Sequence, residues 1–119
     1  MKKVCLCCGG SFAAEPVEVA ESFWTRLCGL MFRPALAPGA GMLLRNCSGI
    51  HCCFMNFSID AVYLDDGLRV IAVETVRPWR LGGLHTGTRH VLEVAAGRAV
   101  SLQPGDRLSW KETGESHGQ

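Results

Sequence analysis

The chain has 119 residues, of which 48% are hydrophobic and 19% are charged, and its formal net charge is +1. This length suits one domain, residues 1–119, and the composition excludes a disordered chain. The near-neutral charge without a long basic run argues against nucleic-acid binding, and no run reaches the ~18 apolar residues of a membrane span. The apolar run after Met1 is too short for a signal peptide, so we expect a cytoplasmic protein.

Short apolar runs separated by turn residues predict a mainly β protein. The strand candidates are residues 3–8, 16–20, 41–44, 49–55, 58–64, 68–76, 89–94, 99–102 and 107–110. The fourth and fifth candidates are either two strands or one bent strand. Asp65, Asp66 and Gly67 predict a hairpin turn, because glycine takes a positive φ without steric cost. We expect a compact β-sandwich or jelly-roll-like barrel of about eight short strands. Residues 112–119 are polar and predict a frayed tail.

One short α-helix is predicted over residues 22–32. Apolar side chains recur there at the spacing of one helix face, namely Phe23, Leu27, Leu30 and Met31. Ser22 can cap the N-terminus, because its hydroxyl accepts a hydrogen bond from a free backbone N–H. We expect this helix to pack on the sheet.

Several short blocks occur in a distinctive order along the chain. They are residues 26–31 (RLCGLM), 41–44 (GMLL), 47, 50–51 (IH), 54–55 (FM), 57–60 (FSID), 78–80 (PWR), 91–97 (VLEVAAG) and 104–106 (PGD). With these blocks the chain resembles the prokaryotic family called domain of unknown function 192, over residues 17–110. The resemblance implies a jelly-roll-like β-sandwich with a short helix, and it implies no reaction.

The chain departs from the family pattern in its cysteines. Cys52 and Cys53 stand where family members usually carry Thr and an aromatic residue. The cluster of Cys5, Cys7 and Cys8 precedes the region of resemblance. Cysteine chemistry would therefore be a property of this sequence, which the resemblance does not imply.

Thiols and one imidazole gather at Cys47, His51, Cys52 and Cys53. Thiolates and imidazole suit zinc, and a nearby His can lower the pKa of a thiol. Cys47, His51 and Cys53 would share one side of a regular strand, so they are the candidate metal ligands. The alternative is that these cysteines are small buried core residues. Seven cysteines is an odd number, and a reducing compartment favours free thiols or metal ligands.

Asp60 is a lone carboxylate in an apolar run, where burial is costly without partners. It is either a general base or polar anchor in a pocket, or a structural group bonded to Arg26, Arg33 or backbone N–H groups. His51, Asp60 and Glu93 can form a His–carboxylate group in a cleft. The alternative for His51 is a hydrogen-bonded structural role.

The loop at residues 77–88 is long for a domain of this size, and long loops on rigid scaffolds often carry binding. Trp79 follows Arg77 and precedes Arg80, so this loop can stack a planar or anionic ligand. The alternative is that Trp79 caps the open end of the sandwich, with the arginine stems lying over it.

Three interpretations follow. The first is a domain that binds a small molecule or a protein partner in a pocket lined by His51, Phe54, Asp60, Trp79, Arg80 and Glu93. The second is a small metal- or thiol-dependent enzyme centred on Cys47, His51 and Cys53, and the third is a structural accessory subunit. We expect a monomer or homodimer with no nucleic-acid or membrane partner and no cofactor, zinc being the alternative.

Overall fold

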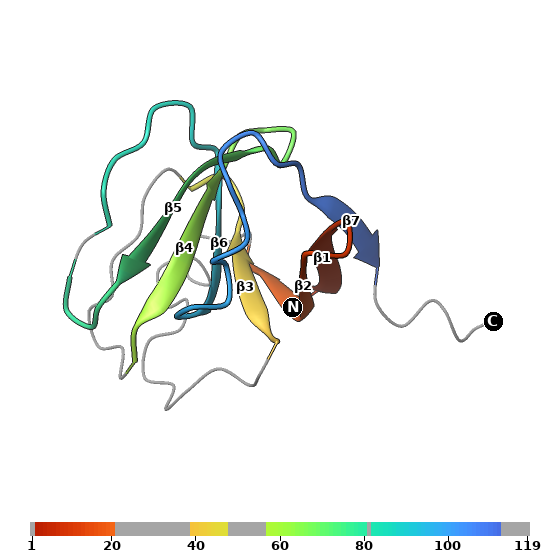
Figure 1. Ribbon diagram of the computed structural model, residues 1–119, viewed down its shortest axis with the longest axis horizontal. Coiled ribbons are helices and arrows are strands. Elements are labelled where there is room, and N and C mark those ends of the chain that lie inside the picture. The colour runs from red at the N-terminus through yellow and green to blue at the C-terminus, as the bar shows by residue number, and fades with distance from the viewer. Residues whose placement is uncertain (1, 21–38, 48–56, 81, 113–119) are drawn as a thin grey trace.

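The structure, a computed structural model, describes residues 2–20, 39–47, 57–80 and 82–112. Their strands are β1 (Lys2–Cys8), β2 (Phe12–Ala20), β3 (Gly41–Leu44), β4 (Ile59–Leu64), β5 (Val70–Val76), β6 (His90–Ala95) and β7 (Ser109–Glu112). These strands form one mixed sheet in the order β5-β4-β6-β3-β2-β1-β7, with β2 and β3 running parallel (Figure 1). The prediction of a mainly β protein is confirmed.

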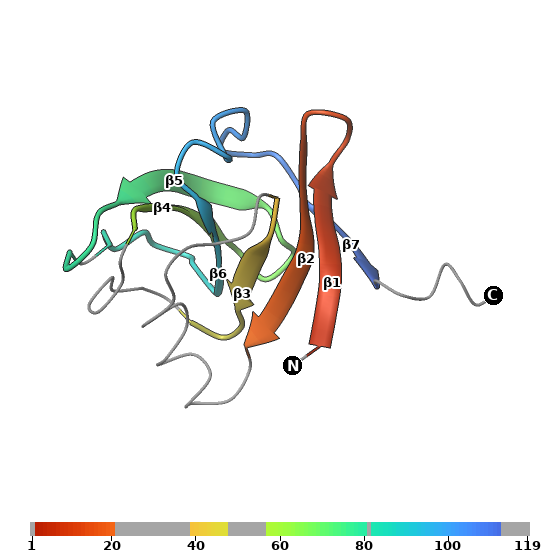
Figure 2. The same ribbon diagram turned by 90° about the horizontal axis from the view of Figure 1, so that it is seen from below.

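The sheet twists strongly, so that β1 and β2 run across the direction of β4 and β5 (Figure 2). This twist allows strands from both ends of the sheet to share one hydrophobic cluster. Its fully buried members include Val4 and Leu6 from β1 and Val62 and Leu64 from β4. Among the described residues the sheet stays open between β5 and β7, so the expected closed barrel is not confirmed.

The two faces of the sheet carry different side chains. The first face carries the cluster just described. The second face carries a second buried cluster that includes Met42, Ala61, Tyr63 and Val91. Successive residues of a strand alternate between the faces, and directly paired residues on neighbouring strands share a face. The strand register therefore assigns each candidate site residue to one face.

The turn between β4 and β5 forms as predicted. Asp65 Oδ1 accepts hydrogen bonds from the backbone N–H groups of Gly67 and Arg69, both at 2.9 Å. These local bonds satisfy backbone N–H groups where the hydrogen bonding between β4 and β5 ends. They form because the short Asp side chain reaches the backbone of the residues that follow it. The turn sets the register of β4 against β5, and it therefore places Asp60 opposite Thr75.

Two sequence-based assignments near the C-terminus are wrong. Residues 99–102 form no strand, because a turn over residues 96–101 replaces it. Glu112, which we expected in the tail, ends β7 and pairs with Val4 of β1. The expected helix at 22–32 and the expected strand at 49–55 lie outside the described residues. Within the described ranges, no helix is long and apolar enough to span a bilayer.

Candidate ligand-binding site at the end of strand β5

Two glutamates lie on the second face in one row across the sheet. Ala61 on β4 is paired with Glu74 on β5 and with Glu93 on β6, and Glu93 is also paired with Met42 on β3. Because the residue between the glutamates is an alanine, no large side chain of β4 separates them. Their surroundings nevertheless differ in burial and hydrogen bonding.

Glu93 is a buried acid in the middle of the sheet. It is 3% exposed, and its Oε1 has no hydrogen-bond partner among the residues that the structure describes. Burial raises the pKa of Glu93 to about 8, because the charged form loses its hydration. Glu93 is therefore mainly protonated and neutral near pH 7, in a position where it can donate a hydrogen bond.

Glu74, in contrast to Glu93, is hydrogen-bonded and has a lowered pKa. Its Oε1 accepts hydrogen bonds from the Tyr63 hydroxyl at 2.8 Å and the Gly83 backbone N–H at 3.0 Å, and lies 3.4 Å from His85 Nε2. Burial alone would raise the pKa of Glu74, but the bonds from Gly83, Tyr63 and His85 together lower it. The Tyr63 and His85 rings also pack against each other in a tilted arrangement, with centroids 4.2 Å apart and an interplanar angle of 45°. Glu74 is therefore a carboxylate that fastens the loop after β5 to the sheet.

A shallow pocket lies where β5 runs into this loop. It has a volume of about 200 Å³ and is lined by Glu74, Thr75, Val76, Arg77 and Arg80. The Arg80 backbone N–H donates to the Arg77 carbonyl at 3.2 Å, which closes a turn and keeps both guanidinium groups on one short segment. The pocket thus combines two positively charged side chains with one carboxylate.

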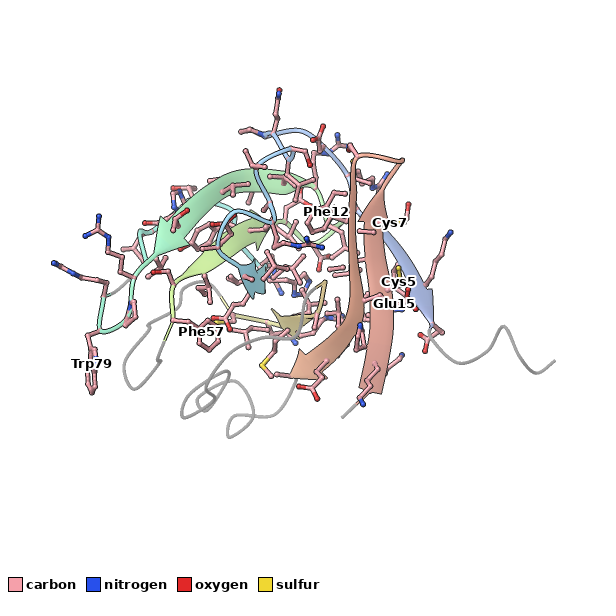
Figure 3. All side chains as sticks on the ribbon, turned by 60° about the horizontal axis from the view of Figure 1, so that its bottom comes forward. Cys5, Cys7, Phe12, Glu15, Phe57 and Trp79 are labelled. Atoms are coloured by element: carbon pink, nitrogen blue, oxygen red, sulfur yellow. The ribbon has the colours of Figure 1, made fainter. Side chains whose placement is uncertain are left out.

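Trp79 projects away from the sheet beside this pocket (Figure 3). Its side chain is 62% exposed, and its φ is 66°, in the left-handed region that bulky residues rarely occupy. Such backbone geometry is often found at binding sites, where surrounding contacts maintain it. The exposed ring is also at odds with the interpretation that Trp79 caps the open end of a sandwich.

Asp60 does not join this site. It is buried on the first face, where its carboxylate accepts hydrogen bonds from Thr75 Oγ1 at 2.7 Å, Gly97 N at 2.9 Å and Ala99 N at 3.1 Å. Asp60 is paired with Val94, whereas Ala61 is paired with Glu93, so the Asp60 and Glu93 side chains leave opposite faces. The expectation that one pocket contains both Asp60 and Glu93 is therefore wrong, because the two side chains lie on opposite faces of the sheet.

The predicted metal site falls largely outside the described residues. Those residues include Cys47 but not His51, Cys52, Cys53 or Phe54. Cys47 packs against the second cluster, and its backbone N–H donates to the Arg89 carbonyl at 2.9 Å. In the part of the chain that the structure describes, no three His, Cys, Asp or Glu side chains are placed to hold a metal ion. The zinc assignment stays a prediction.

Glu74 and His90 are two polar residues that the sequence analysis missed. Glu74 interrupts a strand that is otherwise rich in Val, Ile and Thr, and this interruption was an available signal. His90 is 2% exposed, its Nδ1 accepts from the Asn46 backbone N–H at 3.0 Å, and its Nε2 lies 3.6 Å from Asp66. Burial is the main cause that lowers the pKa of His90, so the neutral ring is favoured. Nothing in the local sequence distinguishes His90 from an exposed histidine.

Comparison with known protein families gives a clear match. The model of the DUF192 family, described as "Uncharacterized ACR", matches residues 5–110. The chain belongs to the DUF192 family. The match begins earlier than the 17–110 that we expected, so Cys5, Cys7 and Cys8 lie within the DUF192 range rather than before it.

Similar proteins extend this assignment. The chain is 37% identical to a UPF0127 protein of Pyrococcus horikoshii over 99 residues, which cover 79% of the chain and 86% of that protein. It is 32% identical to a UPF0127 protein of Pyrococcus abyssi over 102 residues, covering 79% and 85%. A crystal structure of a protein of unknown function from Novosphingobium aromaticivorans matches with a TM-score of 0.77 and 26% identity, covering 91% of the chain and 84% of that protein. DUF192 membership thus gives the fold and a family without an established reaction.

Proposed function

We propose that this DUF192 protein is a small-molecule binding domain whose ligand carries an anionic group and a planar part. The observation that supports the proposal is the pocket at the end of β5, where Arg77 and Arg80 line one cavity and Trp79 lies exposed beside it. Guanidinium groups bind carboxylates and phosphates through paired N–H donors, and an indole ring stacks on planar groups.

Glu74 gives the pocket a fixed frame. Its bonds to Gly83 and His85 join the middle of the loop to β5, and its bond to Tyr63 joins it to β4, so Arg77 and Arg80 lie on a segment that is anchored on both sides. Preorganisation of this kind lowers the entropy cost of binding. The Glu74 carboxylate also disfavours a ligand with a second negative charge close to it, so a singly anionic group at the arginines is preferred.

The test is a titration of the purified chain with benzoate, inorganic phosphate and adenosine monophosphate, followed by tryptophan fluorescence and calorimetry. We expect the two planar anions to bind more tightly than phosphate, because only they can stack on Trp79. Replacement of Arg80 by Ala or Trp79 by Ala should weaken binding by about tenfold each, the value of one lost charged or stacking contact of ~1.4 kcal/mol.

Matched controls exist in the same chain. Arg98 is exposed on the turn after β6, so Arg98→Ala makes the same charge change away from the pocket. Leu84 is 89% exposed on the same loop, so Leu84→Ala removes an exposed apolar group without touching the arginines. The proposal is wrong if all three probes bind the Arg80→Ala protein as tightly as the unaltered protein.

A second candidate is the docking of a protein partner on this loop. The exposure of both Trp79 and Leu84 on one loop favours it, because exposed large apolar side chains are frequent at protein interfaces. The two candidates separate at Leu84. Partner docking requires that Leu84→Ala weaken association, whereas binding of a small planar anion does not.

A further inference from the structure

Strand β1 carries two thiols on the side that faces away from the first cluster. Val4 and Leu6 are fully buried in that cluster, so alternation directs Cys5 and Cys7 to the other side of the strand. Both cysteines are partly buried and neither forms a disulfide. Figure 3 labels them on β1 together with Glu15 of the neighbouring strand.

The two thiols lie close together. Cys5 and Cys7 are two residues apart on the same side of β1, and Cys7 is one of the groups that raise the pKa of the Cys5 thiol. Cys8 is the next residue and packs against the first cluster instead. Cys5 and Cys8 have the Cys-x-x-Cys spacing, but strand alternation separates them, and the pair that meets is Cys5 with Cys7.

Charged groups on both neighbouring strands surround the pair. On β7, Lys111 is paired with Cys5, and Ser109 is paired with Cys7. On β2, Glu15 lies at the irregularity in the ladder opposite Cys5. Burial raises the pKa of the Cys5 thiol, and Glu15 and Cys7 add to this, whereas Lys111 acts in the opposite direction.

We propose that Cys5 and Cys7 form a two-thiolate binding site for a soft univalent cation of the Cu(I) type. Thiolates are the ligands that select Cu(I), and such d¹⁰ cations accept linear coordination by two sulfurs. Structural zinc sites need four ligands, and the described residues contain no group of three or more His, Cys, Asp or Glu side chains placed to hold a metal. The number of donors thus favours Cu(I) over zinc.

The binding step is an exchange of protons for metal. Each thiol loses its proton, two S–Cu bonds form, and the product is an anionic bis-thiolate complex, with no change in oxidation state. The Lys111 ammonium group beside Cys5 stabilises the resulting negative charge. Glu15 opposes it, so Glu15→Gln is expected to tighten binding and Lys111→Gln to weaken it.

The test uses the full-length reduced chain under anaerobic conditions with Cu(I) supplied as its bicinchoninate complex. Transfer of the metal to the protein is followed by loss of the coloured complex. Because other cysteines are present, the site is located by alkylation with iodoacetamide and peptide mapping, with one equivalent of Cu(I) and without metal. We expect Cu(I) to protect Cys5 and Cys7 together and to leave Cys8 as reactive as before.

Variants make the proposal falsifiable. Loss of an outer-sphere partner already weakens metal sites by 10–100-fold, so Cys5→Ser or Cys7→Ser should lower the affinity of the tightest Cu(I) site by about 100-fold or more. Cys8→Ser is the matched control, and circular dichroism checks that each variant folds. The proposal is overturned if the double Cys5→Ser, Cys7→Ser protein keeps the tightest site, if Cu(I) protects Cys8 equally, or if Zn(II) protects the same pair at the same concentration.

Discussion

The buried acid Glu93 predicts a specific dependence of stability on pH. Its pKa is raised from 4.5 to about 8 in the folded protein by burial. Between these two values the folded state holds a proton on Glu93 that the unfolded state has lost, so the free energy of unfolding falls as pH rises. The slope is about 1.4 kcal/mol per pH unit, which amounts to about 3 kcal/mol between pH 5 and pH 7.

Replacement of Glu93 by Gln removes this titration and keeps the shape of the side chain. We expect the free energy of unfolding of Glu93→Gln to lack this downward slope. Between pH 5 and pH 7, the stability of Glu93→Gln should therefore increase by about 3 kcal/mol relative to that of the unaltered protein. His90 contributes a slope of opposite sign, because its pKa is lowered by burial, but it does so in both proteins. The difference between the two proteins therefore isolates Glu93.

The assay is equilibrium unfolding in urea at pH 5, 6, 7 and 8, with the midpoint and slope fitted at each pH. Glu15→Gln is the matched control, since it makes the same chemical change at an exposed position and should follow the unaltered protein. Equal pH slopes for the unaltered protein and Glu93→Gln would refute the conclusion that burial raises the pKa of Glu93.

Three further perturbations test other parts of the structure. Asp60→Ala removes the acceptor of three hydrogen bonds and leaves the buried Ala99 N–H unsatisfied, so urea unfolding should show a loss of about 3 kcal/mol. Gly41→Ala would place a Cβ 2.9 Å from the Glu93 carbonyl oxygen, and this contact with a central strand should lower the free energy of unfolding by about 1–3 kcal/mol, whereas an equally stable variant would contradict the packing. Tyr63→Phe removes one bond to Glu74; we expect NMR titration to show a higher Glu74 pKa, and an unchanged value would contradict that bond.

Local sequence signals were sufficient for most of the sheet. Alternation and β-branched residues marked the described strands, and Asp65 with Gly67 marked a turn that needs only its own backbone. The strand expected at 99–102 was wrong for a non-local reason. Asp60 accepts from the N–H groups of Gly97 and Ala99, which are distant in the sequence, and so holds a turn there.

Less of the candidate site than of the sheet could be predicted from the sequence. The loop with Trp79 and Arg80 was recognised from its composition, and both residues lie at the pocket or beside it. Glu74 was missed because its partners Tyr63, Gly83 and His85 come from separate segments. Asp60 and Glu93 were grouped wrongly, because only the register of β4 against β6 shows that their side chains lie on opposite faces.

The pairing of β1 with β7 has a consequence for synthesis in the cell. Val4 is paired with Glu112, so the first strand of the sheet gains its second neighbour from the other end of the described chain. While the ribosome makes the intervening residues, one edge of β1 has no partner, and an open strand edge can pair with other chains. Pairings between such distant segments also form slowly. Protection of the nascent β1 edge until β7 emerges should therefore increase the fraction of the protein that reaches its native state.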